Sequence, residues 1–171
     1  MTQVFESALQ SGQWPTSVQE LGEGERLVVW AFRRWVSGPE HMPMLAREFG
    51  RQLRQADARP ALVALDTALG ALSRHARRTI VYHQPCCACL GADEVCLISI
   101  VAALQAGAVP AARAMAQWLV RAEGVDSFVA QLDELGDCLS TSGHDLPYRT
   151  RPRAAPQQQP ALQPVAAMRL H

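Results

Sequence analysis

Apolar residues recur every three or four positions along most of residues 1–142, which is the spacing of an amphipathic helix. No segment shows the sustained alternation of apolar and polar residues that is typical of a half-buried strand. The fold class predicted is therefore all-α, a single bundle-like domain of about six or seven helices. The expected helices span residues 2–10, 25–37, 43–54, 60–78, 93–105, 110–124 and 126–139.

Residues that stop or start helices mark the ends of these segments. Gly38-Pro39 ends one helix, and Pro43 and Pro60 suit the first position of the helices that follow, where a missing N–H costs little. Residues 55–59 are then expected to form a connection, and Asp126 is expected to cap the last helix. The β-branched segment at residues 79–82 could be one more helical turn or extended chain, and its periodicity favours neither.

The segment at residues 95–105 is apolar on all sides, which predicts a central helix surrounded by the others. Cys96 lies within it, and Cys138 lies between two leucines of the last helix. A thiol in such surroundings is usually a small core residue.

Residues 143–171 differ from the rest of the chain in composition. They are rich in Pro, Gln and Arg and show little periodicity. Such a segment lacks the apolar surface needed to fold alone. The predicted organisation is a helical domain over residues 1–142 and a disordered tail over residues 143–171. Removing residues 147–171 is then expected to leave the melting temperature almost unchanged.

Charge and composition favour a cytoplasmic protein that binds another protein. All 16 basic residues are Arg and the net charge is zero, which argues against nucleic acid as a partner. No apolar run is long enough for a membrane span, and the first residues lack the basic and apolar parts of a signal peptide. Five cysteines, several of them clustered, do not resemble the disulfide framework of a secreted protein.

The cluster of cysteines at residues 83–89, here called the Cys loop, is the most unusual chemistry in the chain. Cys86-x-x-Cys89 has the spacing with which two thiolates reach one tetrahedral ion. With His83 and Cys87 nearby, the sequence predicts a site for structural or sensory Zn or Fe with the ligands His83, Cys86, Cys87 and Cys89. His75 is an alternative fourth ligand. An iron–sulfur cluster held by Cys86, Cys87, Cys89 and Cys96 is a weaker alternative to the Zn or Fe site.

The same spacing also suits thiol redox chemistry, with Cys86 and Cys89 as the catalytic pair. Cysteines just before a helix feel its positive end, which favours the thiolate. The motif is similar to that of the helical alkyl hydroperoxidase D type, which places Cys-x-x-Cys at a helix start with a His soon after. That resemblance implies a thiol-disulfide oxidoreductase or peroxidase, although here Leu90-Gly91-Ala92-Asp93 follows and supplies no His.

Known enzyme motifs are otherwise missing from the sequence: there is no phosphate-binding Gly-rich loop, no His-Glu-x-x-His and no Gly-x-Ser-x-Gly. The leading hypothesis is therefore a small helical regulatory or interaction protein whose Cys loop binds a metal. The alternatives are the thiol enzyme and a purely structural adaptor with inert thiols.

Overall fold

The computed structural model describes residues 14–149, and every regular element in that part of the chain is helical. Short 3-10 helices cover Val18–Glu20 (η1) and Pro39–His41 (η2). The prediction of an all-α domain is confirmed. The α-helices are α2 (Glu23–Ser37), α3 (Met42–Gln52), α4 (Gln55–His75), α5 (Ala92–Gln105), α6 (Val109–Leu119) and α7 (Ala122–Thr141).

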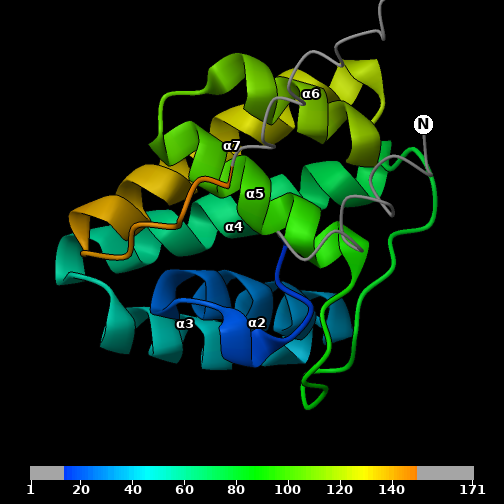
Figure 1. The fold of residues 1–171 in the computed structure, drawn as a ribbon. Coiled ribbons are helices and arrows are strands. Elements are labelled where there is room, and N and C mark those ends of the chain that lie inside the picture. The colour runs from blue at the N-terminus through cyan, green and yellow to red at the C-terminus, as the bar shows by residue number, and fades with distance from the viewer. Residues whose placement is uncertain (1–13, 150–171) are drawn as a thin grey trace, which may run out of the picture.

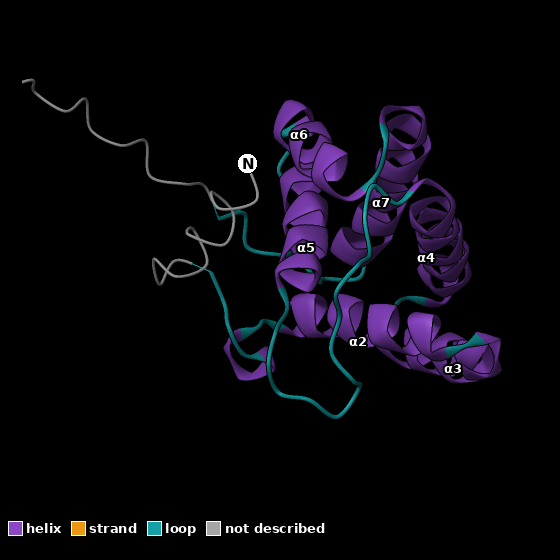
Figure 2. Ribbon diagram, turned by 90° about the vertical axis from the view of Figure 1, so that its right-hand side faces the viewer, coloured by secondary structure: helices purple, strands orange, loops and turns teal. Residues whose placement is uncertain are grey.

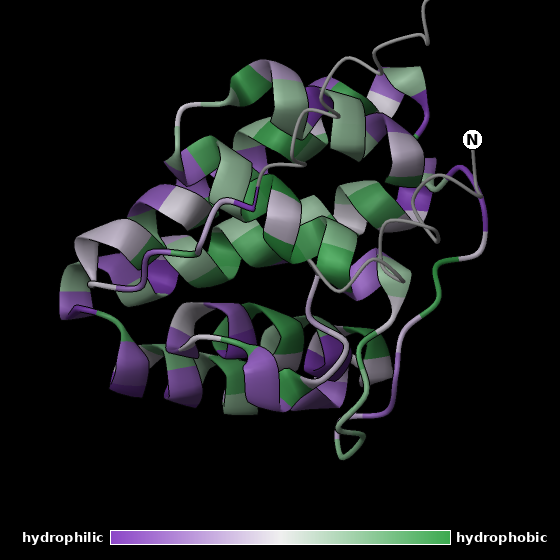
Figure 3. Ribbon diagram, viewed as in Figure 1, coloured by the Kyte–Doolittle hydropathy of each residue, from purple (hydrophilic) through white to green (hydrophobic). Residues whose placement is uncertain are grey.

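The helices form two groups. Helices α2 and α3 make a lower layer, and the other four pack on one side of it (Figures 1 and 2). Helix α4 packs most extensively against α7, and α5 contacts α6, α7 and α2. Figure 3 shows apolar residues along α5, whereas hydrophilic residues lie on the outer side of α3.

Helix α5 lies at the centre, as its apolar sequence predicts. All residues from Asp93 to Leu104 are buried, so the helix has no solvent-facing side. Cys96 is completely buried within it, and Cys138 of α7 is 6% exposed. After α5, Gly107 adopts a left-handed φ of 70°, the conformation that ends helices most readily at glycine.

The predicted start of α4 at Pro60 is wrong. The helix begins at Gln55, so residues 55–59 are helical and Pro60 lies inside the first two turns. Proline cannot donate to the carbonyl four residues earlier, which here belongs to Ala56. Because Ala56 and Pro60 are both exposed, water can reach that carbonyl and the proline is tolerated.

The predicted boundary between α6 and α7 is also wrong. Helix α6 ends at Leu119, and α7 begins at Ala122 with Arg121 as its N-cap, so Asp126 lies inside the helix. The reason is a tertiary contact that the local sequence does not show. The N–H of Arg77 donates to Leu119 and that of Arg121 donates to His75, so the end of α4 fixes the turn.

The packed chain continues past residue 142, the predicted end of the domain. Leu146 is 5% exposed, and its N–H donates to the side chain of Gln105 at 2.8 Å. The guanidinium of Arg149 pairs with the buried carboxylate of Glu25 in α2. Leu146 and Arg149, which lie in the predicted tail, therefore contact the helical domain. Residues 150–171, together with the expected helix at residues 2–10, lie outside the described residues.

Within residues 14–149, none of the helices combines the length and the apolar character that crossing a membrane requires.

Candidate site: the Cys loop and its Arg33–Glu94 support

The Cys loop belongs to the connection between α4 and α5. In Figure 1 this connection descends along the edge of the molecule, passes the lower layer and turns back into α5. Residues 79–82 are not helical in this connection. Carboxylates at the start of α5 explain this, because Asp93 accepts from the N–H of Val81 at 2.7 Å and Glu94 accepts from the N–H of His83 at 3.2 Å.

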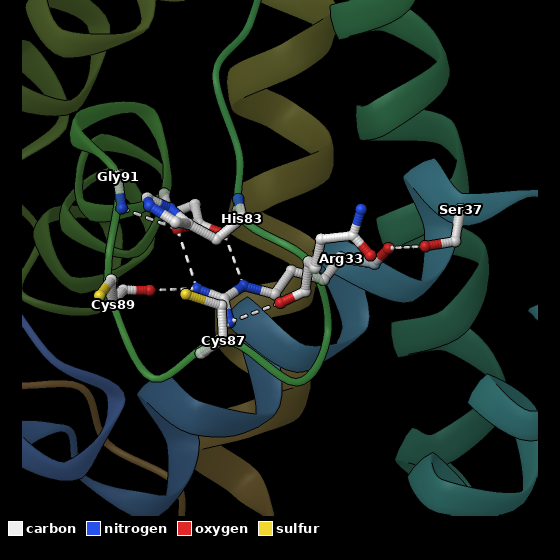
Figure 4. Close-up of polar contacts among 8 residues, drawn as sticks. Arg33, Ser37, His83, Cys87, Cys89 and Gly91 are labelled. Carbon is white, nitrogen blue, oxygen red and sulfur yellow. Dashed lines mark hydrogen bonds and ion pairs between the residues drawn. The ribbon is translucent and has the colours of Figure 1, made fainter.

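Arg33 of α2 holds the backbone of the loop. Its side chain is only 3% exposed, and its guanidinium donates to the carbonyls of Cys87 and Cys89 at 2.6 Å each (Figure 4). A longer bond of 3.3 Å reaches the carbonyl of Gln84. Because guanidinium N–H groups point in fixed directions, these contacts set the path of the backbone across the cysteines.

Glu94 is the counter-charge of Arg33. Its fully buried carboxylate receives two hydrogen bonds from Arg33, at 2.6 and 3.0 Å, and one from the N–H of Gly91 at 2.8 Å. Burial, the largest single influence, would raise the pKa of Glu94. The hydrogen bonds from Arg33, Gly91 and His83 and the charge of Arg33 together outweigh it, so the pKa lies below the ordinary value. The buried pair is therefore ionised on both sides.

A second ion pair supports the upper part of the connection. Arg78 donates to both carboxylate oxygens of Asp93, at 2.5 and 2.8 Å, and its guanidinium lies 5.2 Å from the centre of the Trp118 ring. The bond to Asp93 is the main reason that the pKa of Arg78 is raised. Both acids of the Asp93-Glu94 pair thus hold the connection as well as the start of α5.

Residues 16–18, here called the strap, pair with the loop from the N-terminal side. The N–H of Val18 donates to the carbonyl of Ala88 at 2.8 Å, and the N–H of Leu90 donates to the carbonyl of Thr16 at 2.9 Å. These bonds make an isolated antiparallel bridge between Ser17 and Cys89. Cys89 is therefore held in an extended conformation between the strap and Arg33.

The loop thiols are accessible. Cys86 and Cys89 are exposed and Cys87 is partly exposed, while Cys96 and Cys138 are buried; all five are free thiols. The side chains of Cys87 and Cys89 interact, and this interaction is the main cause that raises the pKa of the Cys89 thiol. A second negative sulfur so close would be repelled, and the nearby charge of Arg33 offsets only part of this effect.

The expectation that the start of the helix favours thiolate is wrong for Cys89. Glu94 occupies the N-terminus of α5 by accepting from the N–H of Gly91, and Asp93 adds a second carboxylate. The negative charges of these two carboxylates offset the positive end of the helix dipole, which therefore does not stabilise a thiolate nearby. The pKa of Cys89 is raised and not lowered, with its interaction with Cys87 as the largest cause.

The four predicted metal ligands lie on one loop, but their donor atoms do not form a prepared site. The ring of His83 lies beside Glu94, with its Nδ1 atom 3.3 Å from the carboxylate. Among residues 14–149, no three His, Cys, Asp or Glu side chains are grouped in a way that could hold a metal ion.

Arg33 was not among the residues predicted for the site. It directly follows Phe32 in the sequence and stands beside a second arginine, Arg34. Glu94 lies in the first turn of α5, where the sequence alone would account for an acid by the helix dipole. A buried charge pair between residues 61 apart in the sequence leaves no local pattern.

Searches of protein-family models, curated proteins and solved structures found no match to this chain.

Proposed function

We propose that this chain is a small helical regulatory protein that responds to thiol oxidants by closing a reversible disulfide between Cys87 and Cys89. The observation that carries the proposal is that Cys87 and Cys89, two residues apart, have their carbonyls fixed on one guanidinium, that of Arg33, while their thiols stay accessible or partly accessible. A reducing compartment such as the cytoplasm would keep the pair in its dithiol form until an oxidant appears.

The proposed reaction is thiol–disulfide exchange with a small disulfide such as oxidised glutathione. One loop sulfur attacks the glutathione disulfide and releases one glutathione thiol, and the second loop sulfur then displaces the other. Both loop S–H bonds and the glutathione S–S bond break, and one protein S–S bond forms. The two electrons and two protons of the loop thiols end on two glutathione molecules.

Mass spectrometry of the intact, reduced chain after exposure to oxidised glutathione tests this proposal. We expect the loss of two hydrogens without an attached glutathione, both in the wild type and in the matched control Cys86→Ser. Cys87→Ser and Cys89→Ser should each be unable to close the bond. If Cys87→Ser still closes it, the pair is Cys86 and Cys89, as in the thiol-oxidoreductase hypothesis. A wild-type chain that never loses the two hydrogens contradicts both the Cys87–Cys89 and the Cys86–Cys89 disulfide.

Metal binding is the second candidate, favoured by the presence of three accessible or partly accessible thiols within four residues. Thiolates suit Zn and Fe, and His83 could complete the set if its ring left Glu94. Metal analysis of freshly purified reduced protein tests this candidate. One equivalent of Zn or Fe that is lost in both Cys86→Ser and Cys89→Ser, but kept in Cys138→Ser, would support it.

The surface beside the loop supports the proposal that the partner is another protein. Val81 is 59% exposed and Tyr82 is 45% exposed, and both precede the loop directly. Tyr82 also contacts Phe32 edge to face, with the ring centres 6.0 Å apart, at the rim of an apolar hollow. Exposed apolar residues around a hollow are typical of protein-binding surfaces. A partner that binds here should be lost on Val81→Asp but retained on the distant Val63→Asp.

A further inference from the structure

The strap and the Cys loop share one short stretch of backbone. On one side, Ala88 and Leu90 bond to the strap; on the other, Cys87 and Cys89 bond through their carbonyls to Arg33. Each peptide unit from Cys87 to Leu90 therefore has a partner in this arrangement. A change in the backbone at Ala88 must break bonds on at least one side.

Disulfide geometry demands such a change. Extended chain advances about 3.3 Å per residue, so residues two apart, such as Cys87 and Cys89, have Cα atoms separated by roughly 6.6 Å. A disulfide tolerates that Cα separation, but side chains two apart in extended chain leave the same face in parallel, so their Cβ atoms are also roughly 6.6 Å apart, whereas a disulfide holds its Cβ atoms at about 3.5–4.5 Å. Closing the ring across a single intervening residue therefore requires the chain at Ala88 to turn out of its extended path.

We infer that disulfide closure and strap binding exclude each other, so that the strap is released when the Cys loop is oxidised. The turn at Ala88 moves the carbonyl that receives the N–H of Val18, and it moves the N–H of Leu90 away from Thr16. The strap is attached to the loop by these two backbone bonds, so both are lost together. This inference rests on the disulfide proposed above and states which structural change follows when that disulfide forms.

The coupling is reciprocal, because two events that exclude each other must disfavour each other to the same extent. A bound strap stabilises the dithiol form of the loop. Weakening the strap should therefore make the loop easier to oxidise, without any change in the cysteines themselves.

Hydrogen exchange of the full-length protein tests the release of the strap. In the reduced protein, the amides of Val18 and Leu90 should be protected, because both donate to backbone carbonyls. In protein whose disulfide has been verified by mass, both amides should exchange at least about tenfold faster, while buried amides of α5 stay protected. A closed disulfide with unchanged protection of Val18 and Leu90 overturns this inference but leaves the redox function standing. A disulfide that never forms overturns the function itself.

A pair of substitutions at Val18 tests the reciprocal effect. Val18→Pro removes the N–H that bonds Ala88, and proline fits there because Val18 is the first residue of η1 and Ser17 is already extended (φ −132°, ψ 146°). Val18→Ala shortens the side chain but keeps the N–H. At equilibrium with a glutathione buffer, the oxidised fraction should rise in Val18→Pro relative to Val18→Ala. Equal fractions in two variants with the same helical circular dichroism overturn the coupling.

Discussion

Glu94 is fully buried, yet its carboxylate stays ionised because Arg33, Gly91 and His83 all donate to it. Replacing Glu94 by Gln keeps the shape and removes the charge, which leaves the guanidinium of Arg33 buried without its counter-ion. Breaking a buried ion pair in this way typically costs about 3–5 kcal/mol. We expect Glu94→Gln to lower the free energy of unfolding by that order, measured by urea denaturation.

The matched control for this substitution is Glu48→Gln. Glu48 pairs with Arg51 at 2.6 Å, which is the distance that joins Glu94 to Arg33, but Arg51 is 69% exposed. Solvent screens such a pair, so the control should lose far less stability. Equal losses in the two variants would mean that the burial of the Arg33–Glu94 pair has no energetic consequence.

The lowered pKa of Glu94 also predicts a pH dependence. A carboxylate whose pKa is lower in the folded than in the unfolded chain stabilises the fold above its ordinary pKa, here 4.5. That stabilisation is lost as the pH falls from 4.5 through the lower folded-state value. The stability difference between wild type and Glu94→Gln should therefore be constant above pH 5 or so and shrink in more acidic solution. Urea titrations across this range measure it, and a difference that grows with acidification would contradict the assignment.

At the scale of the elements, the helices separate the five cysteines into two reactivity classes. Cys96 in α5 and Cys138 in α7 are buried, and burial is the main cause that raises the pKa of each thiol. Maleimide, which reacts with thiolates, should label Cys86 and Cys89 in the folded protein and leave Cys96 and Cys138 unlabelled until urea is added. Mass spectrometry of the time course measures this, and fast labelling of Cys96 would contradict the central position of α5.

Local sequence predicted the elements better than it predicted their ends. Helix α5 was recognisable because a segment that is apolar on every side can only be surrounded. The start of α4 was not recognisable, because proline in the exposed second turn of a helix resembles proline at a helix start. The turn between α6 and α7 depends on backbone bonds to the end of α4, and no neighbouring residue encodes them.

In the candidate site too, some features could be predicted from local sequence, whereas others depend on contacts between distant segments. The accessible cysteines are visible in the sequence as a cluster, and their loop position follows from the helices on both sides. The support from Arg33 is not visible, because it reaches the loop only after α2 has packed beside the start of α5. The proposed pairing of Cys87 with Cys89 likewise depends on the backbone path that Arg33 and the strap impose, which the sequence does not show.

At the scale of the whole molecule, the segment after α7 closes the domain and links its two layers. His144, on this segment, contacts the carbonyl of Gln52 at the end of α3 through its Nε2 atom, at 3.1 Å, and Leu146 is buried. Arg149 then pairs with Glu25, whose carboxylate also caps the start of α2 by accepting from the N–H of Gly22 at 2.9 Å. Both α2 and α5 thus begin with a buried glutamate that is held by a distant arginine.

Two truncations test where the folded domain ends. A chain that ends after residue 149 keeps all the contacts described here and should keep the melting temperature of the full chain. A chain that ends after residue 142 exposes the site of Leu146, which alone is worth about 1.5–3 kcal/mol, and leaves Glu25 buried without Arg149. Its melting temperature, measured by circular dichroism, should fall by several degrees or more. If the pairing of Glu25 with Arg149 stabilises the fold, Arg149→Met in the full chain should reproduce part of that fall in melting temperature. The control Arg113→Met, which removes an exposed pair with Asp126, should not lower the melting temperature in this way.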